Sequence, residues 1–476
     1  MDNQEFKKMG YAFIDWIADY FSGVENYPVM SPVAPGDIKN RLPQAPPING
    51  EMLEHVFSDF KEIILPGITH WQHPSWFAYF PANNSPPSVL AELLTAGLGT
   101  QCMIWQTSPA AAELEETVME WLRQMLGLPE GMAGCIQDTA STATLCAILT
   151  AREKATEFAS NSTGLRTPMA VYASEETHSS IEKAVKIAGL GGKALRAIPT
   201  DDAFAMRPDK LEAAILADIK AGVRPACVVA TLGTTSSTAV DPVEPIGRIC
   251  ERHHVWLHVD AAYAGSAAIL PEKRSMLAGA EYMDSFVFNP HKWMLTNFDC
   301  SAYFVRDPES LIRTFEIHPE YLKTGVDQQV KNYRDWGIQL GRRFRALKLW
   351  FVIRSYGVTG LQDMVREHLR LAQLFRGWVD AHSDFEVMAP VNFSTVCFRI
   401  NGGQDEEVLN AFNARLIDAV NKTGKVYLTH TTLRGKYVLR MVVGQRTTQE
   451  HHVRAAWELI LEKATEILKY RHSIMS

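Results

Sequence analysis

The stretch SFVFNPHKWMLTNFDCSAYFV, residues 285–305, contains two apolar runs joined by a short connection that carries Lys292. Both runs, SFVFN and CSAYFV, are rich in aromatic and β-branched residues, which is typical of strands. The connection is too short for a crossover helix, so we expect the two strands to be antiparallel. A lysine usually prefers water, and its position among apolar residues therefore marks 288–295 as a candidate site.

Five further runs of this kind precede the stretch and alternate with helical segments from about residue 86 onward. They are MAGCIQ (132–137), MAVYAS (169–174), ALRAI (194–198), ACVVATLG (226–233) and VWLHVD (255–260). Strands interleaved with helices such as ELEETVMEWLRQMLG form a mostly parallel sheet. We therefore predict an α/β fold with a seven-stranded, mostly parallel sheet and helices on both faces.

Two smaller regions flank this pattern. Residues 4–22 carry aromatic and aliphatic side chains at helical spacing. This helix needs a surface for its apolar face, on its own domain or on a second subunit, and periodicity does not choose between them. Prolines between 28 and 47 favour an extended linker. The expected domains are an N-terminal helical arm (1–85), a large domain (86–360) and a small C-terminal α+β domain (361–476).

Composition restricts the class of protein. The chain has 476 residues, of which 46% are hydrophobic and 21% charged, as in soluble globular proteins. The net charge of −7 argues against nucleic acid and anionic membranes as partners. Seven cysteines without a C-x-x-C pair disfavour disulfides and a metal cluster and favour a reducing, cytoplasmic location. We expect neither a signal peptide nor a membrane-spanning helix, because the first residues lack a basic segment followed by an apolar run and no run of about 18 or more apolar residues occurs.

Reactive side chains follow several of the predicted strands, where open α/β sheets bind their ligands. They are the hydroxyl-bearing segment 138–141, His178, Thr234–Ser236, Asp260 and Lys292. Segment 138–141 opens a helix and so suits an anion, although it also suits an ordinary helix cap. A lone histidine is more often structural than functional. The absence of GxGxxG after a strand and of GxxxxGK[ST] disfavours dinucleotide and P-loop sites.

One cofactor uses such a set of side chains. Pyridoxal 5'-phosphate needs a lysine for its Schiff base, a carboxylate for its pyridine nitrogen and a phosphate cup. Lys292 suits the first role because apolar neighbours lower the pKa of its amine and keep it nucleophilic. Asp260 suits the second, since a nearby anion favours the protonated ring nitrogen by about 1.4 kcal/mol per pKa unit gained.

The motifs HVDAAYAG (258–265) and NPHKW (289–293) resemble those of the group II pyridoxal-phosphate decarboxylases, and most of all the aromatic L-amino acid decarboxylases. The similarity covers nearly the whole chain and includes THWQHPSWFAYFP, SPAAAELE, VVATLGTTS, YRDWGIQLGRRFRALKLW and LRMVVGQRT. It implies a fold type I enzyme and an obligate homodimer with shared active sites. The N-terminal helices would then clasp the second subunit.

The resemblance also implies roles for individual residues. Lys292 would form the Schiff base, Asp260 would pair with the pyridine nitrogen, and His178 would stack on the ring. The remaining cofactor-binding residues that it implies are Ala140, Ser141, Thr235, Asn289 and His291. Tyr333, in the polar segment LKTGVDQQVKNYRDW, is matched to the mobile-loop tyrosine that protonates the carbanion in the other subunit's site.

The segments that match the family's substrate pocket are largely aromatic, which suits an aromatic substrate. The implied pocket residues are Trp71, Tyr79, Phe80, Ala82, Met103 and Ser355. Ala82 departs from the threonine of animal members, and Gln101 and Met103 replace their apolar residues. A serine at the position of Ser355 leans toward tyrosine or DOPA. No arginine is obviously placed for a second substrate carboxylate.

We therefore expect decarboxylation of aromatic L-amino acids (DOPA, tyrosine, tryptophan, 5-hydroxytryptophan or phenylalanine) to arylalkylamines and CO2. An aromatic aldehyde synthase, which also deaminates its substrate oxidatively, is the alternative. In that branch the loop tyrosine is usually phenylalanine, so Tyr333 favours simple decarboxylation. A catalytically inactive scaffold is disfavoured by the intact set of Lys292, Asp260, His178 and Tyr333.

Overall fold

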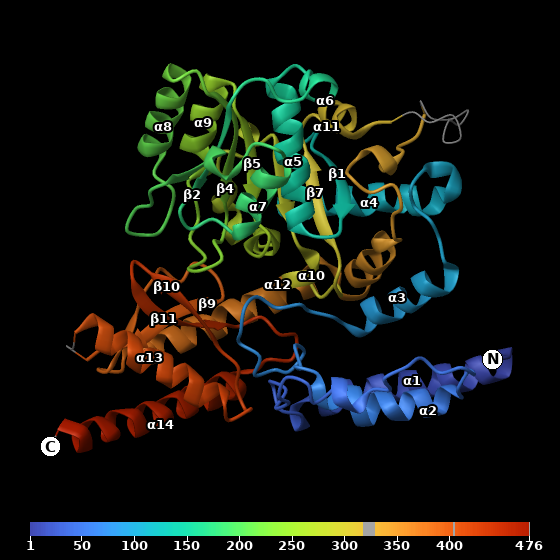
Figure 1. Ribbon diagram of the computed structural model, residues 1–476, viewed down its shortest axis with the longest axis vertical. Helices are drawn as coiled ribbons and strands as arrows, with labels where there is room; N and C mark the ends of the chain where they lie inside the picture. Colours follow the sequence, from blue (N-terminus) through green and yellow to red (C-terminus); the bar gives the residue numbers. More distant parts are fainter. Residues whose placement is uncertain (318–328, 403–404, 476) are drawn as a thin grey trace. The chain divides into compact units, whose positions relative to one another are not determined.

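The computed structural model describes residues 1–317, 329–402 and 405–475 (Figure 1). The chain forms two compact units. The first comprises Met1–Pro81, Gly377–Glu386 and Phe398–Ser476, and the second comprises Ala82–Arg376 and Val387–Cys397. The N-terminal region and most of the C-terminal region thus share one unit. The division into a helical arm (1–85), a large domain (86–360) and a small domain (361–476) stays a prediction.

The second unit contains a seven-stranded sheet in the order β1-β7-β6-β5-β4-β2-β3. The strands are β1 (Ala133–Gln137), β2 (Met169–Ser174), β3 (Leu195–Ile198), β4 (Arg224–Thr231), β5 (Trp256–Asp260), β6 (Ser285–Phe288) and β7 (Ser301–Val305). β7 is antiparallel to both of its neighbours, and the other pairs are parallel. The predicted mostly parallel sheet is therefore confirmed, as is the antiparallel pairing across the connection that carries Lys292.

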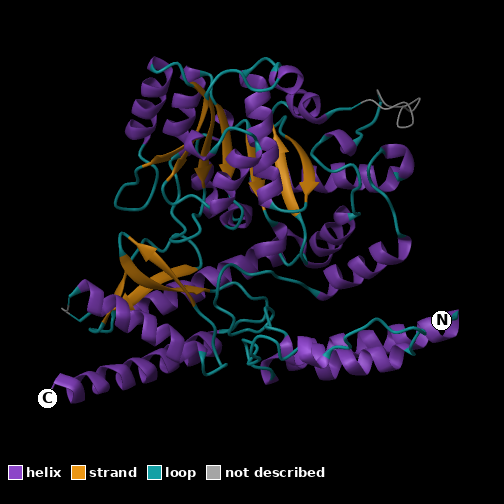
Figure 2. Cartoon of the chain, viewed as in Figure 1, coloured by secondary structure: helices purple, strands orange, loops and turns teal. Residues whose placement is uncertain are grey.

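Helices flank this sheet (Figure 2). They are α3 (Pro86–Leu98), α4 (Pro109–Leu126), α5 (Ala140–Ala155), α6 (Ser160–Thr163), α7 (Ser179–Ile187), α8 (Pro208–Lys220), α9 (Val243–His253), α10 (Pro290–Trp293), α11 (Pro308–Phe315) and α12 (Arg345–Asp380). Every residue of β2, β5, β6 and β7 is buried. Strands covered on both faces need apolar side chains at successive positions, which explains their unbroken hydrophobic runs.

The first unit contains α1 (Asn3–Gly23), α2 (Leu53–Asp59), α13 (Glu406–Asn421) and α14 (Glu450–Met475). A four-stranded sheet has the order β10-β11-β9-β8, with β8 (Phe385–Val387), β9 (Thr395–Ile400), β10 (Thr429–Leu433) and β11 (Lys436–Val442). β9 and β11 carry mostly apolar runs, TVCFRI and KYVLRMV. β8 is short and β10 is a polar edge strand, THTTL, so neither has a strong sequence signal.

The N-terminal helix packs on its own chain. The ring of Phe13 in α1 lies 4.7 Å from that of Phe57 in α2, and the ring of Trp16 lies 5.2 Å from that of Phe60. The predicted clasp on a second subunit stays a prediction. Among the described residues, no helix is long and apolar enough to span a membrane.

Two close approaches fix the loop that follows β5. Gly233, at φ +86°, lies so near Ala264 that a Cβ atom would sit 2.5 Å from the Ala264 Cβ. A Cβ atom on Gly265 would sit 2.4 Å from the Cβ of Phe288. The small residues of AAYAG therefore let the β5 loop pack against the ends of β4 and β6, which places Asp260 beside the strand that leads to Lys292.

We predict that Gly265→Ala destabilises the fold by about 1–3 kcal/mol, because the added methyl group overpacks the contact with Phe288. Urea denaturation measures the change. Gly377→Ala in α12 is the matched control, since no atom lies within 4 Å of its added Cβ, and it should leave the protein equally or more stable. Equal midpoints for the wild type and Gly265→Ala would show that the loop is not packed as described.

Candidate active site

The carboxyl ends of β1, β2, β4, β5 and β6 lie at one edge of the large sheet, because these strands run in the same direction. The residues that directly follow these strands include the predicted cofactor-binding side chains: Ala140, Ser141, His178, Thr235, Asn289, His291 and Lys292, with Asp260 as the last residue of β5. The sheet topology thus brings to one edge side chains that are up to 152 positions apart in the printed sequence (140 to 292).

Lys292 lies in the short helix α10, and its surroundings fix its backbone. Its N–H donates to the Asn289 carbonyl (2.9 Å), and its own carbonyl accepts from the Asn83 amide (3.1 Å). Burial lowers the pKa of the Lys292 amine, while the Asp260 carboxylate opposes that shift. A larger share of the amine is therefore neutral, and so nucleophilic, than in an exposed lysine.

Asp260 is buried at the end of β5. Its Oδ1 accepts from the Ala262 N–H (3.0 Å), which orients the carboxylate toward the loop side of the sheet edge. Its charge acts on both Lys292 and His178. The Asp260 carboxylate is therefore electrostatically coupled to both the Lys292 amine and the His178 imidazole.

His178 caps the N-terminus of α7. Its Nδ1 accepts from the Ser180 N–H (3.1 Å) and lies 2.8 Å from the Ser180 hydroxyl. The surrounding protein desolvates the ring, which lowers the pKa of His178; Asp260 opposes this shift and Lys292 adds to it. Because Nδ1 accepts a hydrogen bond from a backbone N–H, the single proton of the neutral ring lies on Nε2. The result is an accessible, neutral, flat ring at the sheet edge.

The opposite end of the candidate cofactor site is built from the first turn of α5 and from the segment around α10. Thr139 caps α5, and its Oγ1 accepts from the Thr142 N–H (3.4 Å). The first N–H groups of this helix, at Ala140 and Ser141, have no acceptor within the helix and suit a phosphate. Asn289 is buried, and its Oδ1 accepts from the Ser301 hydroxyl (2.5 Å).

His291 is buried beside this end of the site. Its Nδ1 accepts from the Cys300 N–H (2.9 Å). Burial, with a smaller contribution from the Lys292 charge, lowers the pKa of His291 to about 3. The ring is neutral at physiological pH and can offer an anion only an Nε2 hydrogen-bond donor.

Four features at one sheet edge fit pyridoxal phosphate. They are a lysine with a lowered pKa, a buried carboxylate, a flat neutral imidazole and an unsatisfied helix N-terminus. They provide its covalent anchor, its ring-nitrogen partner, its stacking surface and its phosphate cup. The fold and this set of donors define a fold type I pyridoxal-phosphate enzyme.

Comparisons with known proteins agree. Residues 35–401 match the family model for the pyridoxal-dependent decarboxylase conserved domain. Tyrosine decarboxylase 1 of Narcissus pseudonarcissus is 44% identical over 98% of this chain and 94% of that protein. Phenylacetaldehyde synthase of Arabidopsis thaliana is 44% identical over 98% of this chain and 97% of that protein. The crystal structure of Oryza sativa TDC with PLP and tryptamine matches this chain with a TM-score of 0.96 at 40% identity. The match covers 98% of this chain and 99% of that chain. This chain belongs to the pyridoxal-dependent decarboxylase family, and its cofactor is pyridoxal phosphate.

Tyr333 lies in the core of its own chain. Its ring is buried against Trp336 (centroids 5.5 Å apart) and beneath the Arg342 guanidinium (4.7 Å), which is bonded to buried Glu115 (2.6 Å). Burial, then the nearby Glu115 charge, raises the pKa of Tyr333 well above its usual value. A side chain packed in this way would have to leave its core to reach a second subunit. The role of Tyr333 as proton donor stays a prediction.

Residues 322–328 of the polar segment that the sequence matched to the mobile loop fall within 318–328, outside the described residues. That stretch contains another tyrosine, Tyr321. The surrounding motif led the sequence analysis to Tyr333. In the structure Tyr333 packs against Trp336 and is a core residue. The tyrosine nearest to it in the chain, Tyr321, is therefore a necessary comparison in any test.

The predicted pocket residues divide between the two units. Trp71, Tyr79 and Phe80 belong to the first unit, where the Trp71 and Tyr79 rings stack 5.7 Å apart and Arg440 lies 5.4 Å from the Phe80 ring. Ala82, Met103 and Ser355 belong to the second unit. The Met103 carbonyl accepts from the Arg334 N–H (2.8 Å), and Ser355 is exposed on α12. Their role toward substrate stays a prediction.

Sequence reasoning missed the residues that hold the site residues in place. Asn83 bonds the Lys292 carbonyl across 209 positions, and Ser301 donates to Asn289. Ser180, by contrast, is only two positions from His178. A hydroxyl two residues into a predicted helix is a recognisable local signal, but nothing in the sequence links Asn83 to Lys292.

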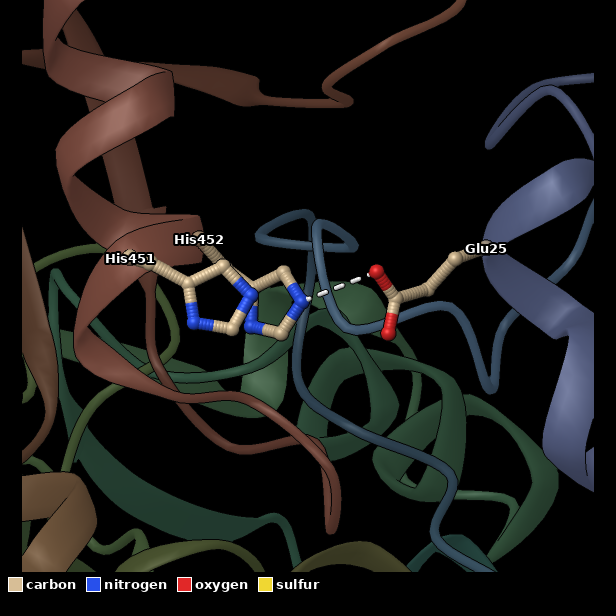
Figure 3. Close-up of side chains that lie close together, drawn as sticks. All are labelled: Glu25, His451 and His452. Atoms are coloured by element: carbon tan, nitrogen blue, oxygen red, sulfur yellow. Dashed lines mark ion pairs between the residues drawn. The ribbon is translucent and has the colours of Figure 1, made fainter.

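The charged, helical sequence context of the pair His451–His452 predicts that both side chains are solvated. In the structure the pair lies near Glu25 in the first unit (Figure 3). Contrary to this prediction His452 is buried, and its Nε2 lies 3.3 Å from the Glu25 carboxylate. Its Nδ1 accepts from the Gln449 N–H (3.0 Å), so in the neutral ring Nε2 bears the proton. A metal on Nε2 would need that proton to move to Nδ1, against the Gln449 donor. The geometry therefore favours a hydrogen-bonded pair over a metal ligand set.

We predict that borohydride reduction of the protein loaded with pyridoxal phosphate attaches the cofactor to Lys292, because burial keeps this amine neutral and nucleophilic. Peptide mass spectrometry locates the adduct. Lys292→Ala should lose both the adduct and the visible imine absorption, whereas Lys183→Ala, which removes an exposed amine of α7, should keep both. An adduct that stays at full yield in Lys292→Ala would contradict the assignment.

Proposed function

We propose that this enzyme decarboxylates aromatic L-amino acids to arylalkylamines and CO2. The observation that carries the proposal is the placement of Lys292, Asp260 and His178 at one sheet edge in a chain that belongs to the pyridoxal-dependent decarboxylases. Similarity to proteins named tyrosine and tryptophan decarboxylases supports the aromatic substrate class.

The residues of this chain would act as follows. Bound pyridoxal phosphate supplies a cationic ring that accepts the electron pair left behind when CO2 departs. The amine of Lys292 holds the cofactor, and the Asp260 carboxylate keeps a proton on the cofactor's ring nitrogen. His178 offers a flat face, and the N–H groups of Ala140 and Ser141, with Asn289, Thr235 and a neutral His291, hold the phosphate. A proton must finally reach the substrate's α carbon from a nearby acid.

A second candidate function is aromatic aldehyde synthesis. The specific observation in its favour is the 44% identity to phenylacetaldehyde synthase of Arabidopsis thaliana. That reaction consumes O2 and water and releases an aldehyde, CO2, ammonia and peroxide. The presence of Tyr333, at the position where the aldehyde synthases usually have phenylalanine, favours the amine as product.

We predict that the wild type forms amine and CO2 in equal amounts, with little peroxide, from a panel of tyrosine, DOPA, tryptophan, 5-hydroxytryptophan and phenylalanine. Amine is measured by chromatography and peroxide by a coupled peroxidase. Stoichiometric peroxide and aldehyde from the wild type would establish the second function instead, and no turnover of any member of the panel would exclude both.

The same assay tests the proton donor. When the tyrosine that donates the proton is changed to phenylalanine, the rate of amine formation should fall at least about 100-fold, as expected for the loss of a general acid. Peroxide formation should rise. Tyr333→Phe and Tyr321→Phe form a matched pair. An effect confined to Tyr321→Phe would reject the role predicted for Tyr333, in line with its burial.

We infer that the active form is a homodimer. Apolar surface supports this: α3 exposes Leu90, Leu93, Leu94 and Leu98, each by more than two fifths. Within the first unit, α1 and α2 form an apolar groove of about 290 Å³ lined by Phe13, Trp16, Phe57 and Phe60, among others. Contiguous apolar surface of this kind is typical of subunit interfaces. None of the seven cysteines forms a disulfide in the structure, which supports a reducing, cytoplasmic location.

We predict that the double variant Leu93→Glu/Leu94→Glu sediments at the 53.3 kDa chain mass, because charges on α3 cannot be buried in an interface. The wild type should sediment at twice that mass. Leu216→Glu changes an equally exposed leucine on α8 (51%) and should remain a dimer. A monomeric wild type with full activity would disprove the inference.

A further inference from the structure

The connection between β6 and β7 carries two of the residues proposed to hold the cofactor phosphate, and the residues at its end fix both of them. The Cys300 N–H donates to the His291 Nδ1 (2.9 Å), and the His291 N–H donates to the Cys300 carbonyl (3.3 Å). The Ser301 hydroxyl donates to the Asn289 Oδ1 (2.5 Å). The position of Cys300 and Ser301 therefore decides where the His291 ring and the Asn289 amide lie.

Asp299, the residue before Cys300, is held by an arginine from a later part of the chain. The Arg345 Nε donates to the Asp299 Oδ1 (3.0 Å), and the Arg345 Nη2 donates to the Asp299 Oδ2 (3.2 Å). Arg345 is buried, and the Asp299 side chain is 17% exposed. Two parallel bonds between a planar guanidinium and a carboxylate fix the direction of both groups. Arg345 therefore sets the position of the backbone that continues into Cys300 and Ser301.

The charges around Arg345 do not follow the pattern that stabilises a helix. Arg345 and Lys348 lie in the first turn of α12, and Arg343 precedes it, although a helix N-terminus favours acidic over basic side chains. The Lys348 amine lies 3.0 Å from the Glu92 carboxylate, and Arg343 pairs with both Glu92 and Asp299. These five groups carry three positive charges and two negative ones. Helix stability gives no reason for this arrangement.

The same cluster of charges lies beside the phosphate end of the site. The ring of Phe298, next to Asp299, lies 4.7 Å from the His291 ring, and the charges of Lys348 and Asp299 both act on that imidazole. His291 is neutral and the Asn289 amide carries no charge, so both can recognise a phosphate only through hydrogen bonds. The strength of a hydrogen bond depends on its distance and angle. Exact placement of these two side chains is therefore what phosphate binding needs.

We propose that Arg345 is a positioning residue for the cofactor phosphate. Through its two bonds to Asp299 it fixes the backbone that holds the two phosphate-binding side chains. This inference rests on the proposed function, in which Asn289 and His291 bind the phosphate. Loss of Arg345 should therefore weaken the binding of the phosphate group and leave the rest of the cofactor site intact.

Cofactor binding to Arg345→Gln tests the proposal. The full chain, freed of its cofactor, is titrated with pyridoxal 5'-phosphate or with pyridoxal, which lacks the phosphate, and the imine absorption gives each Kd. We expect Kd for pyridoxal 5'-phosphate to rise at least about 10-fold, as for weakened hydrogen bonds to a charged group, while Kd for pyridoxal stays within about twofold.

Arg366→Gln is the matched control. It removes another two-bond pair of α12, with Glu272 (2.7 and 3.3 Å), whose arginine side chain is 43% exposed. Both Kd values of this variant should equal those of the wild type. An equal loss of affinity for the two compounds in Arg345→Gln would show general damage to the fold and overturn the proposal.

The double variant Arg345→Gln/Asp299→Asn separates positioning from charge. It removes one charge of each sign, so the cluster keeps its net charge and neither partner is left as an uncompensated charge. If Arg345 acts through Asp299, the double variant should bind pyridoxal 5'-phosphate as weakly as Arg345→Gln does. The same loss relative to pyridoxal is expected of the double variant if Arg345→Gln alone does not fold. Wild-type affinity in the double variant would overturn the proposal.

Failure of the proposed phosphate site gives a different result. Asn289→Ala should weaken the binding of pyridoxal 5'-phosphate and leave that of pyridoxal unchanged. If Asn289→Ala and Arg345→Gln both bind pyridoxal 5'-phosphate like the wild type, the proposed phosphate site is wrong. If only Arg345→Gln does so, the positioning role of Arg345 alone is wrong.

Discussion

The coupling of the Lys292 amine with the Asp260 carboxylate at the edge of a buried sheet is the constraint on which the active site depends. An amine in an apolar environment loses its proton more readily, and a carboxylate nearby limits that loss. The chain meets both conditions by ending β5 at Asp260 and placing α10 directly after the neighbouring strand β6. The short return to antiparallel β7 then keeps Lys292 next to the sheet.

Several features of the fold serve this constraint. Gly233 and Gly265 let the loop after β5 pack closely against Ala264 and Phe288. Asn83 and Asn289 hold the backbone on either side of Lys292. His291, buried and neutral, adds no positive charge beside the amine that has to stay nucleophilic. The phosphate end of the site therefore relies on backbone dipoles more than on charged side chains, which agrees with the N-terminus of α5 at that position.

The sequence predicted the strands with strong local signals and missed those without them. Strands such as β2, β5, β6 and β7 were found because all of their residues are buried and hence largely apolar. β10, a polar edge strand, and β8, with three residues, carry no such signal. At the site, His178 and Lys292 were found from their positions after strands. Tyr333 shows the limit of this reasoning, because a tyrosine in a polar stretch turned out to be buried beneath Arg342.

The sequence by itself determined the class of fold, the family and the cofactor, because these are encoded in short apolar runs and in motifs such as NPHKW that remain local along the chain. Only the tertiary structure decided which distant groups meet, such as Asn83 with Lys292 and Glu115 with Arg342 above Tyr333. Such contacts depend on how the elements pack, and packing joins positions whose separation in the sequence carries no information about their distance in space.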